Sequence, residues 1–178
     1  MKLIAITKPD FYDGEAAFIK RLFESGFDIV HLRKPNSDID SCRNILNELS
    51  SEERSKIVVH DYPELYYEFS LKGIHINKNI VKYPEGYQGF KTRSCHSLEE
   101  VKLYKDDLDY VFLSPIFDSI SKQGYKSAFT EDELRLASEE GIIDEKVVAL
   151  GGVTYDKISL LKDLGFGGAA MMGGAFIS

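Results

Sequence analysis

Short runs of apolar, mostly β-branched or aromatic residues recur along the chain, and each is followed by a helical pattern or a polar loop. Continuous apolar runs of this length are typical of parallel strands that are buried on both faces. The candidate strands, most of which are continuously apolar, cover residues 3–7, 27–33, 56–60, 73–76, 90–94, 110–114, 146–150 and 168–172. The pattern therefore predicts eight strands in sequence order.

Several of the stretches between these runs have helical signals. Helices are predicted over residues 14–25, 97–105, 130–140 and 154–164. A Ser or Thr followed three residues later by Glu is the capping-box signature, and it opens two of these helices, at Ser97 and at Thr130. Residues 77–89 contain a proline and two glycines, so we expect little helix there.

Eight alternations of strand and helix predict an α/β fold, a (β/α)8 TIM barrel formed by residues 1–178 as a single domain. A doubly wound open sheet is the alternative, but no G-x-G-x-x-G motif follows the first strand. The barrel is small, since about 250 residues are usual. Because the sequence ends soon after the eighth strand, we expect the eighth helix to be missing or truncated, with a possible homo-oligomer covering that flank.

The composition and the net charge indicate which classes of molecule the protein is expected to bind. Hydrophobic residues make up 43% and charged residues 29% of the 178 residues, as in soluble globular proteins. A net charge of -7 argues against a nucleic-acid binder, and no apolar run is long enough to cross a membrane. Two cysteines form no disulfide framework, so we expect a reduced, cytoplasmic protein.

Polar side chains gather where the predicted strands end, which is where barrel enzymes place their active sites. All histidines of the chain lie at or beside strand ends, at His31, His60, His75 and His96. Alternation along the second strand puts His31 and Arg33 on one face. Both side chains could belong to an active site. Alternatively, Arg33 forms an ion pair with Asp61 or Asp28, and His31 has a structural role. For His75 we expect a structural role.

Pairs of glycines follow the last two predicted strands, as Gly151-Gly152 and Gly173-Gly174. In many barrels the loops after these strands bind phosphate, because glycine lets backbone N–H groups approach an anion closely. The sequence therefore predicts a phosphate site there. The alternative is tight turn geometry without a ligand.

The predicted loop over residues 114–129 is long for a compact domain, and such loops are usually functional. Ser119, Ser121 and Lys122 could donate hydrogen bonds to an anion or to a substrate carboxylate. A solvated charged loop is the alternative.

Five segments, in order along almost the whole chain, resemble the family of thiamine phosphate synthase and its relative TenI. They are VHLR, VVHD, RSCHSLEEV, SPIFDSISK and VVALGGVT. The resemblance implies a barrel that binds a thiazole phosphate at Gly151, Gly152, Gly173 and Gly174. A synthase joins an aminopyrimidine diphosphate to the thiazole phosphate, whereas a tautomerase rearranges the double bonds of a carboxythiazole phosphate.

The synthase pattern is altered at the expected diphosphate site. Where it has Gln, Arg and Lys at alternate positions, this sequence has His31, Arg33 and Pro35, with Lys34 on the other face. Its Asn-Asp pair is His60-Asp61 here, and no second acidic magnesium ligand follows the fourth strand. The loop keeps Lys122, and two serines retain the hydroxyl groups of its two threonines. A synthase would need Mg²⁺, with Asp61 as its ligand; a tautomerase would need no metal.

The resemblance therefore favours a TenI-like tautomerase, whose pattern also has His-x-Arg on the second strand. His96 is then the general acid and base, Arg33 or Lys122 holds the carboxylate, and His31, His60 and Ser94 line the substrate site. The alternatives are the synthase and a non-catalytic barrel that binds a thiamine precursor and regulates a partner. A zinc hydrolase is disfavoured, because the sequence has no H-x-H or H-E-x-x-H spacing.

Overall fold

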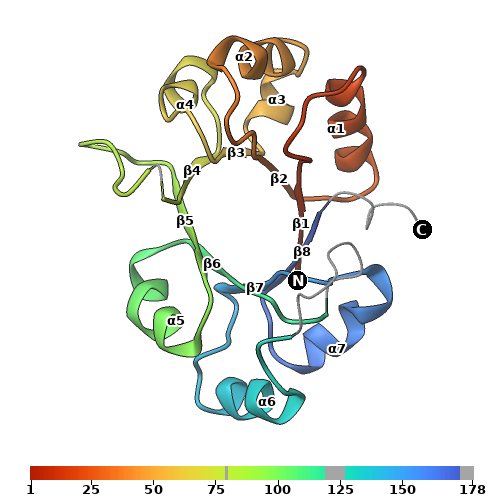
Figure 1. The fold of residues 1–178 in the computed structure, drawn as a ribbon, viewed down its shortest axis with the longest axis vertical. Coiled ribbons are helices and arrows are strands. Elements are labelled where there is room, and N and C mark those ends of the chain that lie inside the picture. The colour runs from red at the N-terminus through yellow and green to blue at the C-terminus, as the bar shows by residue number, and fades with distance from the viewer. Residues whose placement is uncertain (79, 119–126, 173–178) are drawn as a thin grey trace. The chain divides into compact units, whose positions relative to one another are not determined.

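The computed structural model describes residues 1–78, 80–118 and 127–172, and its strands pair in parallel, in sequence order, as a closed barrel (Figure 1). The strands are β1 (Lys2–Ile6), β2 (Ile29–Leu32), β3 (Ile57–Val59), β4 (Gly73–Ile76), β5 (Phe90–Cys95), β6 (Tyr110–Leu113), β7 (Val147–Ala149) and β8 (Gly168–Met172). The prediction of a small TIM barrel with eight strands is confirmed. The predicted absence of an eighth helix concerns residues outside those described.

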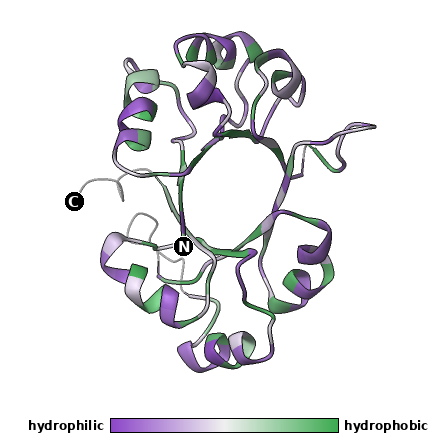
Figure 2. Cartoon of the chain, turned by 180° about the vertical axis from the view of Figure 1, so that it is seen from behind, coloured by the Kyte–Doolittle hydropathy of each residue, from purple (hydrophilic) through white to green (hydrophobic). Residues whose placement is uncertain are grey.

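The chain divides into two compact units, which we call the N-terminal unit (Ile4–Lys91) and the C-terminal unit (Met1–Leu3 with Thr92–Ser178). Most strands are apolar and the helices are mixed, as Figure 2 shows, whereas β5 has the mostly polar sequence FKTRSC. Strand residues such as Val30, Val58 and Val148 are almost fully buried. Among the described residues, no helix is long and apolar enough to cross a membrane.

In the N-terminal unit the helices lie on the same side of β2 to β4 (Figure 1). They are α1 (Glu15–Glu24), α2 (Ile39–Asn47), α3 (Ser51–Arg54) and α4 (Glu64–Phe69). Only α1 is predicted from the sequence. Two of the others begin at recognisable caps, since the Asp38 carboxylate accepts from the Ser41 N–H and Ser50 forms a reciprocal capping box with Glu53.

The C-terminal unit contains α5 (Leu98–Tyr104), η1 (Lys105–Asp107), α6 (Glu131–Glu139), η2 (Tyr155–Lys157) and α7 (Ile158–Asp163). The capping box predicted at Thr130 is present. At α5 the Ser97 hydroxyl accepts from the Glu100 N–H, but the Glu100 carboxylate accepts from the N–H of His96 and not of Ser97. Glu100 therefore fixes the backbone of a predicted site residue.

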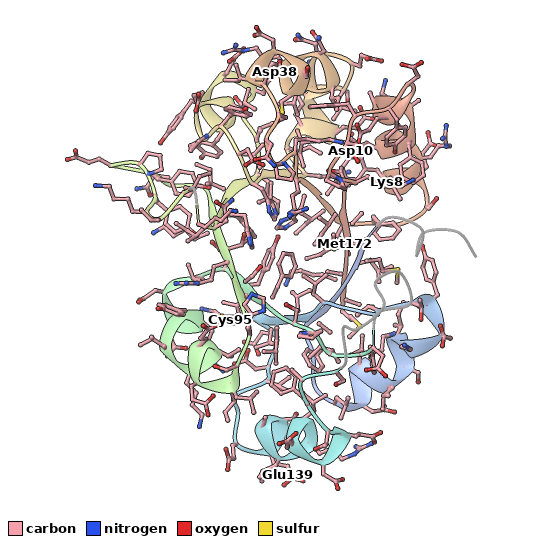
Figure 3. All side chains as sticks on the ribbon, viewed as in Figure 1. Lys8, Asp10, Asp38, Cys95, Glu139 and Met172 are labelled. Carbon is pink, nitrogen blue, oxygen red and sulfur yellow. The ribbon has the colours of Figure 1, made fainter. Side chains whose placement is uncertain are left out.

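A buried ion pair joins the end of β2 to the first residue of α1, and the same lysine binds the loop between β1 and α1. The Lys34 ammonium donates to Glu15 Oε1 at 2.6 Å and to the backbone oxygens of Lys8 and Asp10, both at 2.9 Å. The two side chains are 0% and 2% exposed. Figure 3 labels Lys8 and Asp10, which lie just after β1. Lys34 thus holds this loop in place, on the face of β2 opposite to Arg33, as alternation predicts.

Because the Glu15–Lys34 pair is buried, we expect a single substitution to lower the free energy of unfolding much more than the double substitution does. Lys34→Met leaves the buried Glu15 carboxylate without its cation and should lower the free energy of unfolding by about 3–5 kcal/mol. Lys34→Met combined with Glu15→Leu should recover most of that loss. Urea denaturation of each variant measures the free energy of unfolding.

The matched control is Lys56→Met, which removes the exposed Lys56–Glu52 pair. It should lower the free energy of unfolding much less than Lys34→Met does, because solvent screens that pair. Equal losses for Lys34→Met and Lys56→Met would contradict a stabilising role for the buried pair.

Candidate active site

The register of the N-terminal unit brings three histidines to one face of its strands. His31 lies in β2 beside Val58 of β3, and Val59 lies beside Ile74 of β4. The next residues along, His60 and His75, are therefore also neighbours. Since side chains alternate along each strand, the imidazoles of His31, His60 and His75 point to the same side.

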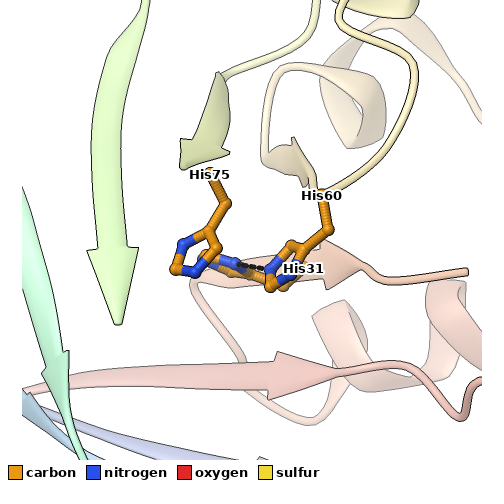
Figure 4. A group of neighbouring side chains, drawn as sticks. All are labelled: His31, His60 and His75. Carbon is orange, nitrogen blue, oxygen red and sulfur yellow. Dashed lines mark hydrogen bonds between the residues drawn. The ribbon is translucent and has the colours of Figure 1, made fainter. Parts of the chain in front are cut away.

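These three imidazoles, which we call the histidine cluster, are in mutual contact (Figure 4). His31 Nδ1 lies 2.7 Å from His60 Nε2, within hydrogen-bond distance. The rings of His60 and His75 are stacked, with centroids 4.1 Å apart, and His31 lies edge-on to both. All three residues are buried. The structure thus brings His31 and His60 into contact with each other and with His75, for which the sequence predicts a structural role.

Burial disfavours the charged form of two histidines in this cluster. It lowers the pKa of His31 and of His60 well below the ordinary value for histidine. Neighbouring His75 lowers both pKa values further, and the Arg33 guanidinium adds to the effect on His60. The positive charge of Arg33 therefore lies near the histidine cluster.

Arg33 follows β2 directly, and its backbone is held by β1. Its N–H donates to Thr7 Oγ1 at 3.0 Å, and the Thr7 hydroxyl donates to its carbonyl oxygen at 3.3 Å. Within the described parts of the chain, no ion pair joins Arg33 to Asp61 or Asp28. The alternative of a structural ion pair is therefore not what the structure shows, and the half-buried guanidinium is available for an anion.

Asp61 is the acidic residue that fits a magnesium ion bound to a diphosphate. It is half-buried after β3, and its Oδ2 accepts from the Lys34 N–H at 3.2 Å, which fixes the carboxylate and leaves Oδ1 for a cation. After β4, Asn77 is already engaged, since its Oδ1 accepts from Ile80 N–H and its Nδ2 donates to the His60 carbonyl. One carboxylate suffices when the substrate phosphates supply the other oxygen ligands.

In the C-terminal unit, His96 is an exposed imidazole in a fixed orientation. Its Nδ1 lies 3.2 Å from both the carbonyl and the hydroxyl oxygen of Ser114, at the end of β6. With Nδ1 so engaged, Nε2 remains to exchange a proton with a substrate. The preceding residue, Cys95, is buried, which raises the pKa of its thiol to about 11 and makes it unsuited to act as a nucleophile. Ser94 lies in β5 beside Phe112 of β6.

The first glycine pair forms a turn against the segment that follows β6. Gly151 and Gly152 have φ angles of 93° and 62°, which favour glycine. A Cβ on Gly151 would lie 2.8 Å from Pro115 Cα, and one on Gly152 would collide with the Asp118 carbonyl oxygen. Close packing thus accounts for both glycines.

This turn nevertheless leaves backbone donors for an anion. The Gly151 and Gly152 carbonyl oxygens accept from Phe117 N–H at 3.0 Å and Lys157 Nζ at 2.9 Å. Among the described residues, neither glycine N–H donates a hydrogen bond. The geometry is compatible with the predicted phosphate site as well as with a tight turn.

The remaining predicted site residues, Ser119, Ser121, Lys122, Gly173 and Gly174, lie outside the described residues. A cavity of about 390 Å³ lies in the C-terminal unit, between the segment after β6 and helices α6 and α7. Phe117, Leu134 and Leu160 are among its lining residues, and none of the predicted site residues is.

We expect a side chain at Gly152 to destabilise the protein in two ways. It would strain the left-handed backbone, and it would also collide with the neighbouring segment. Gly152→Ala should lower the free energy of unfolding by about 1–2 kcal/mol for the backbone, plus about 1–3 kcal/mol for the collision with Asp118. Gly141→Ala is the control, because Gly141 has a φ of 72° and a Cβ there would meet nothing within 4 Å. Equal losses in urea denaturation would show that the Gly152 turn is not tightly packed.

Comparison with known sequences and structures places this geometry in a family. A family model described as thiamine monophosphate synthase matches residues 3–175. The thiamine-phosphate synthase of Limosilactobacillus reuteri is 28% identical over 152 residues, which is 82% of this chain and 69% of that protein. That of Lactococcus lactis subsp. cremoris is 26% identical over 172 residues, or 90% and 78%.

Among solved structures, the thiamine phosphate pyrophosphorylase of Bacteroides thetaiotaomicron is similar, with a TM-score of 0.89 and 43% identity over 97% of this chain and 83% of that one. The enzyme of the same name from Pyrococcus furiosus has a TM-score of 0.74 at 20% identity, over 96% and 85%, and supports the fold alone. The matching family model and this structural likeness confirm the resemblance of the sequence segments. The chain belongs to the thiamine monophosphate synthase family.

Proposed function

We propose that the protein is a thiamine phosphate synthase, which joins an aminopyrimidine diphosphate to a thiazole phosphate and releases diphosphate. The observation that carries the proposal is the family match over residues 3–175, together with relatives that are named synthases. The sequence analysis favoured the tautomerase over the synthase, and the proposal prefers the synthase. The relatives compared above support the synthase and not the tautomerase.

The reaction sets the chemical demands on the site. The bond between the pyrimidine methylene carbon and the diphosphate oxygen breaks, and the diphosphate leaves with the electron pair. The thiazole nitrogen then attacks the methylene carbon, and a carbon–nitrogen bond forms. The main task of the protein is therefore to stabilise negative charge on the departing diphosphate and to hold both substrates in line.

Arg33 is suited to the departing diphosphate. Its guanidinium is half-buried, has no carboxylate partner within the described chain, and can give two parallel N–H donors to phosphate oxygens. Lys122 is the second cation that the resemblance implies. The N–H groups of Gly151 and Gly152 would hold the phosphate of the thiazole, with the second glycine pair as the resemblance implies.

Asp61 would hold Mg²⁺ in this site. When bound there, the ion would neutralise charge on the diphosphate. The Asp61 carboxylate is kept in position by the Lys34 N–H, and Lys34 is itself fixed by its buried pair with Glu15. The ion pair described above thus supports the position of a proposed metal ligand.

A tautomerase is the second candidate, and the exposed His96 imidazole favours it. Oriented by Ser114, His96 could take one proton from a ring carbon and return one to a nearby position, so that the double bonds move and no other reactant is consumed. The phosphate-binding turn would serve both reactions. A single assay distinguishes them.

We predict that the purified protein forms thiamine phosphate when it receives the aminopyrimidine diphosphate, the thiazole phosphate and Mg²⁺. Mass spectrometry of the product and a coupled assay of released diphosphate measure the reaction. Omitting either substrate should abolish diphosphate release. Rearrangement of a carboxythiazole phosphate alone, with no thiamine phosphate in the complete mixture, would refute the synthase and support the tautomerase.

We also predict that Arg33→Ala lowers the turnover rate of the synthase reaction by about 100-fold or more, because it removes a preorganised cation from the leaving group. Binding of the thiazole phosphate, measured by calorimetry, should change little. Arg43→Ala is the control, since it removes an arginine that pairs with Asp40 and Glu68 on the surface. An active Arg33→Ala variant would exclude Arg33 from the reaction.

A further inference from the structure

We propose that His31, His60 and His75 form a binding site for one divalent transition-metal ion, and that Zn²⁺ is the ion that fits it best. The site uses imidazole nitrogens alone and is distinct from the oxygen ligand Asp61. It does not depend on the proposed synthase activity, because the ion could be bound whichever reaction the protein catalyses.

The distances within the histidine cluster suit a metal ion. Each histidine offers one ring nitrogen, and these three atoms all lie within 4.8 Å of one another. Zinc–nitrogen bonds of about 2.1 Å in a tetrahedral arrangement need nitrogens about 3.4 Å apart. The distance of 2.7 Å between His31 Nδ1 and His60 Nε2 is below that value, so the rings would have to rotate for these two nitrogens to bind one ion.

The backbone that carries the rings is fixed before any ion binds. The His31 carbonyl accepts from the Thr7 N–H at 3.0 Å, and the His60 N–H donates to the Leu32 carbonyl at 3.1 Å. The Asn77 side-chain amide donates to the His60 carbonyl. Three ligands on consecutive parallel strands lose little freedom when they bind an ion, which favours affinity.

The donor atoms determine which ion is bound. Imidazole nitrogen suits Zn²⁺, Co²⁺, Ni²⁺ and Cu²⁺, whereas Mg²⁺ requires oxygen ligands and dehydrates reluctantly. Three protein ligands are typical of zinc sites that keep a fourth position for water or a substrate atom. The histidine cluster should therefore discriminate against Mg²⁺ even at millimolar concentration.

The charge of Arg33 acts against a cation at this place, since the guanidinium lies near enough to influence His60. A dication with three neutral ligands also keeps its full charge. Both effects favour an anionic fourth ligand, such as hydroxide or a phosphate oxygen, which would offset the excess positive charge. The competing explanation for the cluster is a hydrogen-bonded group of imidazoles that holds no ion.

The test is a titration of the full-length protein, freed of metal by a chelator, with Co²⁺ and with Zn²⁺ in the absence of substrates. Tetrahedral Co²⁺ absorbs visible light strongly, so its spectrum reports both stoichiometry and geometry. We expect one Co²⁺ per chain with a dissociation constant of about 10 μM or lower. Zn²⁺ should displace it, and millimolar Mg²⁺ should not.

Three variants remove one ligand each: His31→Gln, His60→Asn and His75→Asn. Each should weaken Co²⁺ binding by at least about 100-fold, since even loss of an outer-shell partner costs about 10–100-fold. His96→Asn is the matched control, because it removes the remaining histidine of the chain, which lies outside the cluster. Circular dichroism checks that each variant is folded.

If a variant fails to fold, the wild-type titration still decides. A wild-type protein that shows no tetrahedral Co²⁺ spectrum and no binding below about 1 mM would overturn the proposal. So would unchanged binding in any folded cluster variant, or a loss of binding in His96→Asn equal to that in the cluster variants. Because no substrate is present, these outcomes are independent of the synthase assay.

Discussion

Parallel pairing in register is the constraint on which the candidate site depends. His31 and His60 are 29 residues apart in the sequence, yet their rings are within hydrogen-bond distance, because β2 and β3 run side by side and end at the same edge. Alternation along each strand then decides which side chains share that edge. The apolar residues of the same strands form the buried core, so folding and site assembly have a common cause.

Two adjacent cationic residues at the end of β2, Arg33 and Lys34, have different surroundings. Arg33 points to the face of the histidine cluster and has no carboxylate partner in the part of the chain that the structure describes. Lys34 points the other way and is fully committed to Glu15 and to the backbone of the β1–α1 loop. Burial raises the pKa of the Glu15 carboxyl, while Lys34 opposes that shift. We propose that Arg33 binds an anion, whereas the buried Lys34 holds the loop.

Much of the fold could be predicted from the sequence, because continuous apolar runs are a direct sign of parallel buried strands. Helices α2, α3 and α4 were not predicted, and all three are short. Side-chain caps open α2 and α3, whereas α4 begins at Pro63 without one. The contact of His75 with the other two histidines could not be predicted for another reason: it follows from the register of β3 with β4, which no single segment encodes. The residues 119–126 and 173–178, which carry part of the predicted site, lie outside the described chain.

The family match supports the proposal of an enzyme that handles phosphorylated substrates. In that proposal Arg33 and Asp61 bind a diphosphate, and the Gly151–Gly152 turn binds a thiazole phosphate. The most direct test of this central claim is a crystal structure of the protein with thiamine phosphate, diphosphate and Mg²⁺. The account predicts the thiamine phosphate phosphoryl group on the N–H groups of Gly151 and Gly152, and the diphosphate on the Arg33 guanidinium. Phosphoryl groups bound away from both places would contradict it.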